Sequence, residues 1–234
     1  MTRLALITGA GRGIGAACAR ALAAAGCHVV LTSRTRAELD ATARAITDAG
    51  GEAHVHPADL ADPAAIDALF TALTDRFGHL DVLVNAAAVI EPAPLEAIDL
   101  AAYERVMAVN VRAVFLCCQR AFPLMRDRGG AIINLSSLGG VRSTQKFPGL
   151  STYTASKAAV IGLTEALAVE GRPHRIRVNA IAPGAVDTVM LRTAAPFLRT
   201  STTPDDIAPT AVFLADPTRS GKISGAVLEV FSNE

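Results

Sequence analysis

A tyrosine and a lysine four residues apart, Tyr153 and Lys157, carry the clearest chemical signal in the sequence. Residues at this spacing leave the same face of a helix, so the two side chains are expected to be neighbours. A phenol has a pKa of about 10, which is too high for efficient proton transfer at neutral pH. A nearby ammonium group is expected to lower that pKa because it favours the phenolate. The pair therefore predicts a proton donor and acceptor, although so short a pattern also arises by chance.

Two serines, Ser136 and Ser137, end the stretch before the helix that carries Tyr153. A serine hydroxyl at this position could hold a carbonyl or alcohol oxygen while the tyrosine exchanges the proton. A nicotinamide cofactor would then handle the hydride. This interpretation requires a nucleotide-binding turn elsewhere in the chain.

A glycine-rich turn lies near the start of the chain. The apolar run 4–8 is followed by Gly9, Gly13 and Gly15, in the spacing G-x-x-x-G-x-G, and then by the alanine-rich segment 16–25. This order predicts a strand, a tight turn and a helix. Glycines let the backbone approach a phosphate, and the start of a helix attracts an anion. The common dinucleotide pattern G-x-G-x-x-G fits poorly, and an ordinary helix start is the alternative.

Basic residues follow the second predicted strand, 27–32. An NAD site usually has an acidic residue about 20 residues after the turn, where it binds the ribose 2′-OH. Here no acidic residue precedes Glu38, and Arg34 follows the strand. Guanidinium groups bind phosphate through charge-assisted hydrogen bonds. Arg34, with Arg12 in the turn as a second contact, therefore favours the 2′-phosphate of NADP(H); the alternative for Arg34 is a solvated loop charge.

Composition excludes several other classes of protein. The chain has 234 residues and a formal net charge of zero, so neither nucleic acid nor an anionic membrane is an expected partner. The glycine turn arrives too early for a leader segment, and no apolar run is long enough for a membrane span. The four cysteines form no C-x-x-C pair and predict reduced core residues of a cytoplasmic protein. His54 and His56 lack a third ligand, so no metal site is expected.

Strand-like and helix-like segments alternate along the chain, which predicts one domain over residues 1–234. The alternation predicts an α/β fold, a Rossmann-type doubly wound parallel sheet of about seven strands with helices on both faces. Predicted strands cover 4–8, 27–32, 53–56, 80–84, 131–135, 175–181 and 226–230. Predicted helices cover 16–25, 35–49, 62–77, 99–126 (in one piece or two), 151–170 and 204–214.

Together these motifs resemble those of the classical short-chain dehydrogenase/reductase family, over essentially the whole chain. Residues 8–15 resemble the family's T-G-x-x-x-G-x-G turn, and residues 153–157 resemble its Y-x-x-x-K. Asp59 resembles the acid that contacts adenine. Pro183-Gly184 with Thr188 resembles the P-G-x-x-x-T at the nicotinamide end.

The resemblance implies a catalytic set of four residues. Tyr153 would be the general acid/base, and Lys157 would lower its pKa and bind the nicotinamide ribose. Ser137 would orient the substrate oxygen. Asn110 would hold a helix irregularity and a water of the proton relay. The resemblance also implies a homo-oligomer, a tetramer or a dimer, with the helix of Tyr153 at one interface.

The predicted cofactor site combines the glycine turn, the strand ends and the helix of Tyr153. Its residues are Gly9, Arg12, Gly13, Ile14, Gly15, Ser33, Arg34, Asp59, Leu60, Asn85, Ala86, Ala87, Tyr153, Lys157, Pro183, Gly184, Val186 and Thr188.

Four segments depart from the family pattern. Asn85-Ala86-Ala87-Ala88 replaces N-N-A-G, so a looser turn is expected after the fourth strand. The segment between Ser137 and Tyr153 is longer than usual and would line the substrate entrance. The segment between 184 and 204 is short, which predicts an open cleft. The tail 230–234 differs from the family's V-D-G-G, which puts its interface role in question.

The sequence thus predicts an NADP(H)-dependent oxidoreductase that interconverts a ketone or aldehyde and an alcohol. Its substrate would be a partly apolar small molecule in a cleft lined by Ala88, Val89, Leu138, Phe147, Leu150, Leu191 and Phe197. One alternative is a non-catalytic NADP(H)-binding sensor or assembly subunit, against which the intact catalytic set argues. An epimerase or dehydratase on a related fold is weakened by the short lid and the small size of the chain.

Overall fold

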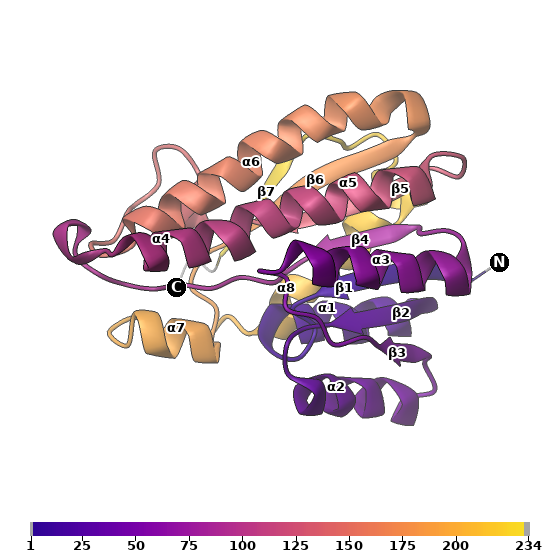
Figure 1. Cartoon of the computed structure of the whole chain (residues 1–234), viewed down its shortest axis with the longest axis horizontal. Helices are drawn as coiled ribbons and strands as arrows, with labels where there is room; N and C mark the ends of the chain where they lie inside the picture. Colours follow the sequence, from indigo (N-terminus) through magenta and orange to yellow (C-terminus); the bar gives the residue numbers. More distant parts are fainter. Residues whose placement is uncertain (1, 232–234) are drawn as a thin grey trace.

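Seven parallel strands form one sheet in the order β3-β2-β1-β4-β5-β6-β7, in a computed structural model that describes residues 2–231 (Figure 1). This confirms the predicted doubly wound, Rossmann-type sheet. The strands are β1 (Arg3–Thr8), β2 (Cys27–Thr32), β3 (Ala53–Val55), β4 (Val82–Asn85), β5 (Gly130–Leu135), β6 (Ile176–Pro183) and β7 (Val227–Val230).

Helices cover both faces of the sheet. One layer consists of α1 (Gly13–Ala24), α2 (Arg36–Asp48) and α8 (Pro204–Ala215), and the other of α3 (Pro63–Phe77), α5 (Ala113–Met125) and α6 (Ser151–Gly171). Figure 1 shows the second layer in front of the sheet. Alternate residues of β1 face the two layers. Ala5 and Ile7 pack with the first, and Leu4 and Leu6 pack with the second. A strand buried on both sides is apolar throughout, as the sequence of β1 is.

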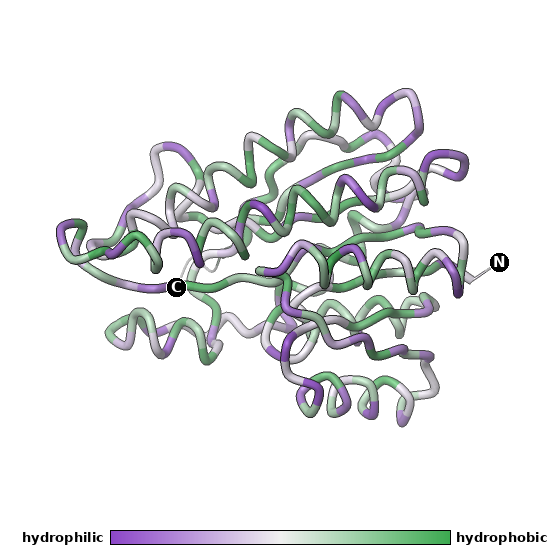
Figure 2. The backbone as a smooth tube through the Cα atoms, in the orientation of Figure 1, coloured by the Kyte–Doolittle hydropathy of each residue, from purple (hydrophilic) through white to green (hydrophobic). Residues whose placement is uncertain are grey.

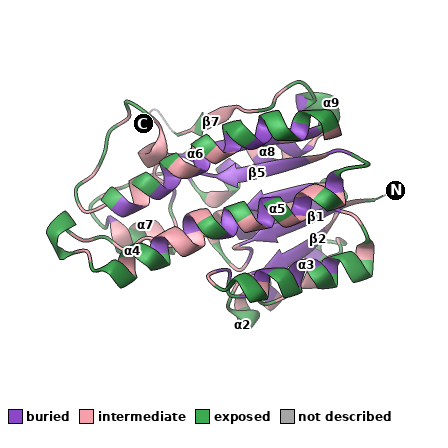
Figure 3. Ribbon diagram, turned by 45° about the horizontal axis from the view of Figure 1, so that its top comes forward, coloured by how far each residue is buried: buried purple, intermediate pink, exposed green. Residues whose placement is uncertain are grey.

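Burial follows the same layers. The central strands β1, β4, β5 and β6 are largely buried, and exposed residues recur along α3, α5 and α6 (Figure 3). Hydrophobic residues recur along the strands and alternate with hydrophilic ones along the helices (Figure 2). All four cysteines are buried free thiols, as predicted, and burial raises the pKa of Cys18 and of Cys117 to about 12. Among residues 2–231, no helix combines the length and apolar character needed to cross a membrane.

Local signals place several element boundaries. Asp62 caps α3, because its Oδ1 accepts a hydrogen bond from Ala64 N at 2.9 Å, with Pro63 as the first helical residue. The predicted helix over 99–126 is three pieces: α4 (Leu100–Met107), a π-helical turn (Ala108–Arg112) and α5. Short elements that the sequence analysis missed are α7 (Val189–Ala194), α9 (Pro217–Ser220) and 3₁₀ turns at Leu95–Ala97, Leu138–Gly140 and Arg172–His174. The departure expected at the tail falls partly on residues 232–234, outside the described residues.

Glycine is required where α1 meets the turn before it. A Cβ on Gly15 would lie 2.2 Å from the Gly9 carbonyl oxygen. Gly9 has a φ of +67°, and a Cβ there would lie 2.8 Å from the backbone of Ala87. Side chains at either position would therefore separate the turn from α1 or from the loop after β4. The backbone of the glycine turn thus contacts both the start of α1 and the loop after β4.

Candidate active site

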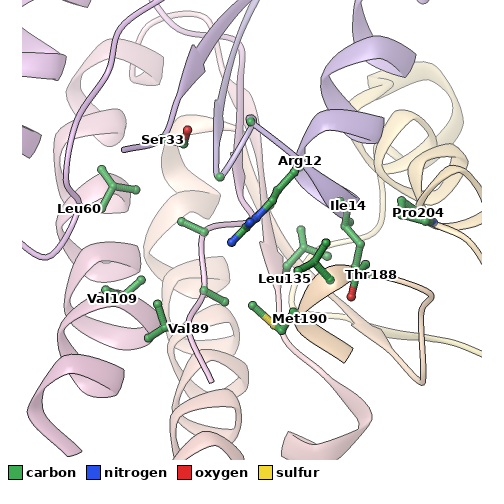
Figure 4. Close-up of a pocket in the computed structure, with 18 of the residues that line it drawn as sticks. Arg12, Ile14, Ser33, Leu60, Val89, Val109, Leu135, Thr188, Met190 and Pro204 are labelled. Atoms are coloured by element: carbon green, nitrogen blue, oxygen red, sulfur yellow. The ribbon is translucent and has the colours of Figure 1, made fainter. Parts of the chain in front are cut away.

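The strand order reverses at β1, which pairs with β2 on one side and β4 on the other. In open α/β sheets, ligands bind beyond the carboxyl ends of the strands at such a reversal. A cavity of about 380 Å³ opens here (Figure 4), lined by the glycine turn, the ends of β2 and β4, and residues of α6. The fold therefore brings the two motifs of the sequence, the turn and the Tyr153–Lys157 pair, to one place.

Most of the predicted cofactor residues line this cavity. They are Gly9, Arg12, Gly13, Ile14, Gly15, Ser33, Arg34, Asp59, Leu60, Ala86, Ala87, Tyr153, Lys157, Pro183 and Thr188. Gly184 and Val186 line a second cavity that adjoins the first.

The structure corrects the prediction for Asn85. Its side chain is buried, and its Nδ2 donates to Asn134 Oδ1 at 2.9 Å. The amide thus fastens β4 to β5 instead of lining either cavity. The loose turn expected after β4 is also not seen, because Thr8 Oγ1 accepts hydrogen bonds from Ala86 N at 3.0 Å and from Ala87 N at 3.2 Å. One hydroxyl oxygen has two lone pairs and can accept both.

Ser137, Tyr153 and Lys157 meet where β5 ends beside α6. The Ser137 hydroxyl accepts a hydrogen bond from Gly139 N at 3.1 Å and is hydrogen-bonded to the Tyr153 phenol. Lys157 is buried, and its Nζ donates to the Leu135 carbonyl at 2.7 Å. The same ammonium lies 5.6 Å from the centre of the Tyr153 ring. The serine hydroxyl and the phenol can therefore reach a common oxygen atom.

Asn110 lies behind these residues, outside the lining of both cavities. It sits in the π-helical turn, which confirms the predicted helix irregularity. Its Oδ1 accepts from Val89 N at 2.8 Å, and its Nδ2 donates to Val89 O at 2.9 Å and to Ser156 Oγ at 3.0 Å. The amide therefore joins the loop after β4 to the helix that carries Lys157.

The ionisation of the pair differs from our prediction. Burial raises the pKa of Tyr153. The hydrogen bond with Ser137 lowers it, but by less. Burial lowers the pKa of Lys157 from 10.5 to about 8. The sequence analysis expected Lys157 to lower the phenol's pKa, but in this structure desolvation of the buried phenol dominates.

Hydrogen-bond donors gather at the other end of the first cavity. The Ser33 hydroxyl is shielded from solvent and has no partner among the described residues. Within residues 2–231, the exposed Arg34 side chain makes no ion pair. The Arg12 side chain extends from the turn into the cavity (Figure 4). With the glycine backbone at Gly9 and Gly15, these groups fit a phosphorylated dinucleotide.

Sequence reasoning missed several residues of the first cavity, and Glu38 is the one with chemical consequences. Its Oε1 lies 3.5 Å from Arg12 Nη1. The available signal was its position in the first turn of a helix, where acidic residues are favoured and face the preceding chain. The others are Gly11, Thr35, Ala58, Val109, Leu135, Asp187, Val189, Met190, Arg192 and Pro204. Ala88 and Val89, which were predicted to line the substrate cleft, and Ser136 also line this first cavity.

The second cavity, of about 320 Å³, continues from the first past Tyr153 and Met190, which line both. Its walls include Ile90, Leu138, Phe147, Leu150, Leu191 and Leu198.

The short segment after β6 does not leave this cleft fully open, because it folds as α7. Thr188 Oγ1 starts that helix by accepting a hydrogen bond from Leu191 N at 3.1 Å. Phe147 and Phe197 approach each other near the second cavity, with ring centres 6.3 Å apart. Lys146 is the single lysine, arginine, aspartate or glutamate in the described lining of this cavity, and its Nζ donates to Val141 O at 2.5 Å. The cleft therefore suits an apolar molecule.

In the part of the chain that the structure describes, no three His, Cys, Asp or Glu side chains lie close enough together to bind a metal ion.

Known proteins resemble this chain over almost all of its length. The family profile described as short chain dehydrogenase matches residues 3–198. Levodione reductase of Leifsonia aquatica is 38% identical over 193 residues, which cover 81% of this chain and 71% of that protein. The 3-oxoacyl-(acyl-carrier-protein) reductase of Synechocystis sp. is 36% identical over 237 residues, which cover 97% and 95%.

A solved structure agrees with the fold as well. The gluconate 5-dehydrogenase of Burkholderia cenocepacia, in complex with NADP and tartrate, has a TM-score of 0.88 and 34% identity, and the match covers 97% of this chain and 93% of that one. Strand order, motif positions and sequence agree, and the chain therefore belongs to the short-chain dehydrogenase/reductase family of oxidoreductases.

Proposed function

We propose that this protein is an NADP(H)-dependent enzyme that interconverts a ketone or aldehyde and an alcohol, with Tyr153 as the general acid/base. The observation that carries the proposal is the position of Tyr153, which lines both the glycine-turn cavity and the apolar cavity. A phenol at that boundary can reach an oxygen of a substrate in one cavity while the cofactor occupies the other. The non-catalytic alternative is not favoured, because a sensor has no need of such a group.

The chain's own residues define how the two molecules would be held. Backbone groups of the glycine turn would bind the pyrophosphate, and Arg34 and Ser33 would bind the 2′-phosphate. Asp59 would contact the adenine, and Thr188 and Pro183 would lie at the nicotinamide end. The similar gluconate 5-dehydrogenase solved with NADP supports this choice of cofactor.

The proton chemistry falls to three side chains. A bound nicotinamide supplies or accepts the hydride. Tyr153 donates its proton to the carbonyl oxygen during reduction and accepts it from the alcohol during oxidation. The Ser137 hydroxyl hydrogen-bonds to the same oxygen and fixes its position. The raised pKa of Tyr153 keeps the phenol protonated at neutral pH, as a proton donor must be. Lys157, beside the ring, stabilises the phenolate that forms when the proton leaves.

The substrate we propose is a compact, uncharged and largely apolar carbonyl compound or alcohol. Apolar side chains outnumber polar ones in the lining of the second cavity, and its lysine is hydrogen-bonded to backbone oxygen. The Lys146 ammonium donates to Leu138 O, Val141 O and Thr144 Oγ1, so a substrate carboxylate would have to displace these hydrogen bonds to pair with it, which weakens the compensation for its desolvation.

We also propose that the protein is a homo-oligomer. Leu100 in α4, Phe115 in α5 and Val169 in α6 are apolar and exposed, and these three helices lie in front of the sheet in Figure 1. Large exposed apolar side chains on neighbouring helices favour a surface that another chain covers.

Replacing the proposed acid/base removes one hydroxyl and nothing else. Tyr153→Phe should reduce turnover by at least about a hundredfold, with the Kd for NADPH changed less than about twofold. Tyr103→Phe is the control, because Tyr103 is the only other tyrosine and lies in α4, outside both cavities. Steady-state rates and fluorescence titration with NADPH measure the two quantities. Undiminished turnover in Tyr153→Phe would refute the role assigned to this residue.

The cofactor assignment predicts a selective loss at Arg34. Arg34→Ala should weaken NADPH binding about tenfold, because a charge-assisted contact to the 2′-phosphate is lost, and should leave NADH binding unchanged. Arg36→Ala is the matched control, since Arg36 Nε is already bonded to Asp40 at 3.0 Å and lies outside the cavity. Calorimetric titration with both dinucleotides measures the affinities. Equal losses for NADPH and NADH would contradict the assignment.

Lys157 predicts a pH dependence of stability. The unfolded chain keeps the Lys157 proton up to its ordinary pKa of 10.5, whereas the folded chain releases it near pH 8. Folding is therefore penalised in full below pH 8, by on the order of 3 kcal/mol, and the penalty disappears as the pH rises to 10.5. As the pH rises from 8 to 10.5, the free energy of unfolding of the wild type should increase relative to that of Lys157→Met. Denaturant unfolding at several pH values measures it.

The exposed Lys222 provides the control for this experiment. Lys222→Met should run parallel to the wild type over the same pH range. A constant difference between the wild type and Lys157→Met would show that Lys157 is not destabilised by burial.

A further inference from the structure

Arg12, one of the two arginines proposed for the 2′-phosphate, already has an anionic neighbour. Glu38, in the first turn of α2, places Oε1 at 3.5 Å from Arg12 Nη1, and both side chains line the cavity. The Arg12 side chain is 66% exposed and that of Glu38 is 35% exposed, so solvent weakens the attraction between the two charges. Among residues 2–231, Arg34 has no such neighbour.

The Glu38 side chain lies against the glycine turn itself. A Cβ on Gly11 would lie 2.9 Å from Glu38 Cβ and 3.0 Å from its Oε2. The same Cβ would lie 2.9 Å from the unpartnered Ser33 hydroxyl. The carboxylate, the hydroxyl and the Arg12 guanidinium therefore border one small volume, which is where the proposed function places the 2′ position of the ribose.

The backbone of α2 is fixed in this position. Thr42 Oγ1 is hydrogen-bonded to the Gly11 carbonyl at 3.3 Å and to the Glu38 carbonyl at 3.2 Å. Thr42 is buried, so the start of α2 cannot move away from the turn without exposing it. A cofactor can displace the carboxylate of Glu38 only by rotating its side chain.

We propose that Glu38 is a specificity-determining residue that limits the preference for NADP(H). Its carboxylate competes with the 2′-phosphate for Arg12 and repels that phosphate directly. When the ribose carries a 2′-hydroxyl instead, the same carboxylate accepts its hydrogen bond, as acidic residues do in NAD sites. Arg34 favours one cofactor and Glu38 favours the other. This inference rests on the proposed function, because it assumes that a dinucleotide binds in this cavity.

Charge removal at Glu38 tests the proposal by binding alone. Glu38→Gln keeps the size and polarity of the side chain, and Glu38→Ala removes its acceptor as well. Both should tighten NADPH and 2′,5′-ADP by about threefold to tenfold, and neither should tighten NADH. Isothermal titration calorimetry with these three probes measures the Kd values, and thermal unfolding verifies that each variant is folded.

Asp40→Asn is the matched control. Asp40 lies two residues further along α2, pairs with Arg36 and is outside the lining of both cavities. Its substitution removes the same charge and should leave all three affinities unchanged.

The outcomes separate this inference from the proposed function. An unchanged ratio of NADPH to NADH affinity in Glu38→Gln, or a shift toward NADH, overturns the role of Glu38. If Arg34→Ala still weakens NADPH selectively in that case, the cofactor proposal stands without it. A wild-type protein that binds neither dinucleotide overturns both.

Discussion

Backbone contact between Gly9 and Ala87 is the constraint on which the site depends. No Cβ fits at Gly9, since it would lie 2.8 Å from the Ala87 backbone. The two residues follow β1 and β4, the neighbouring strands between which the sheet reverses its order. Thr8 secures the contact by accepting two hydrogen bonds from the β4 loop. The cavity exists because the loops after these two strands diverge from this point.

A second constraint is the buried ammonium of Lys157. Burial that lowers its pKa to about 8 destabilises the fold, and a methionine of similar length would avoid the cost. The compensation in the structure is a hydrogen bond to the Leu135 carbonyl at 2.7 Å. A residue that costs stability in this way and sits beside Tyr153 is best explained by its chemistry. Asn110 supports the arrangement from behind by joining Val89 to Ser156, next to the lysine.

The sequence predicted those features that local pattern determines. The glycine turn, the alternation of strands and helices and the helical spacing of Tyr153 and Lys157 each depend on residues close together in the chain. Asn85 was misplaced because its partner, Asn134, is 49 residues away and only the β4–β5 register brings them together. Glu38 was overlooked because its proximity to Gly11 depends on how α2 packs on the turn. The pKa of Tyr153 was predicted in the wrong direction because desolvation sums over every neighbour, whereas the sequence shows only the lysine.

The most direct test of the account is a panel of ketones, aldehydes and alcohols. The absorbance of NADPH and, in parallel, of NADH follows the consumption or formation of the reduced cofactor, and substrate loss and product formation are measured alongside it. The panel should run from compact apolar carbonyl compounds to carboxylated ones of similar size. The account predicts reduction of the compact apolar compounds, with one NADPH consumed for each alcohol formed and weaker activity on the carboxylated analogues. Tight NADPH binding without turnover of any compound in either direction would contradict it.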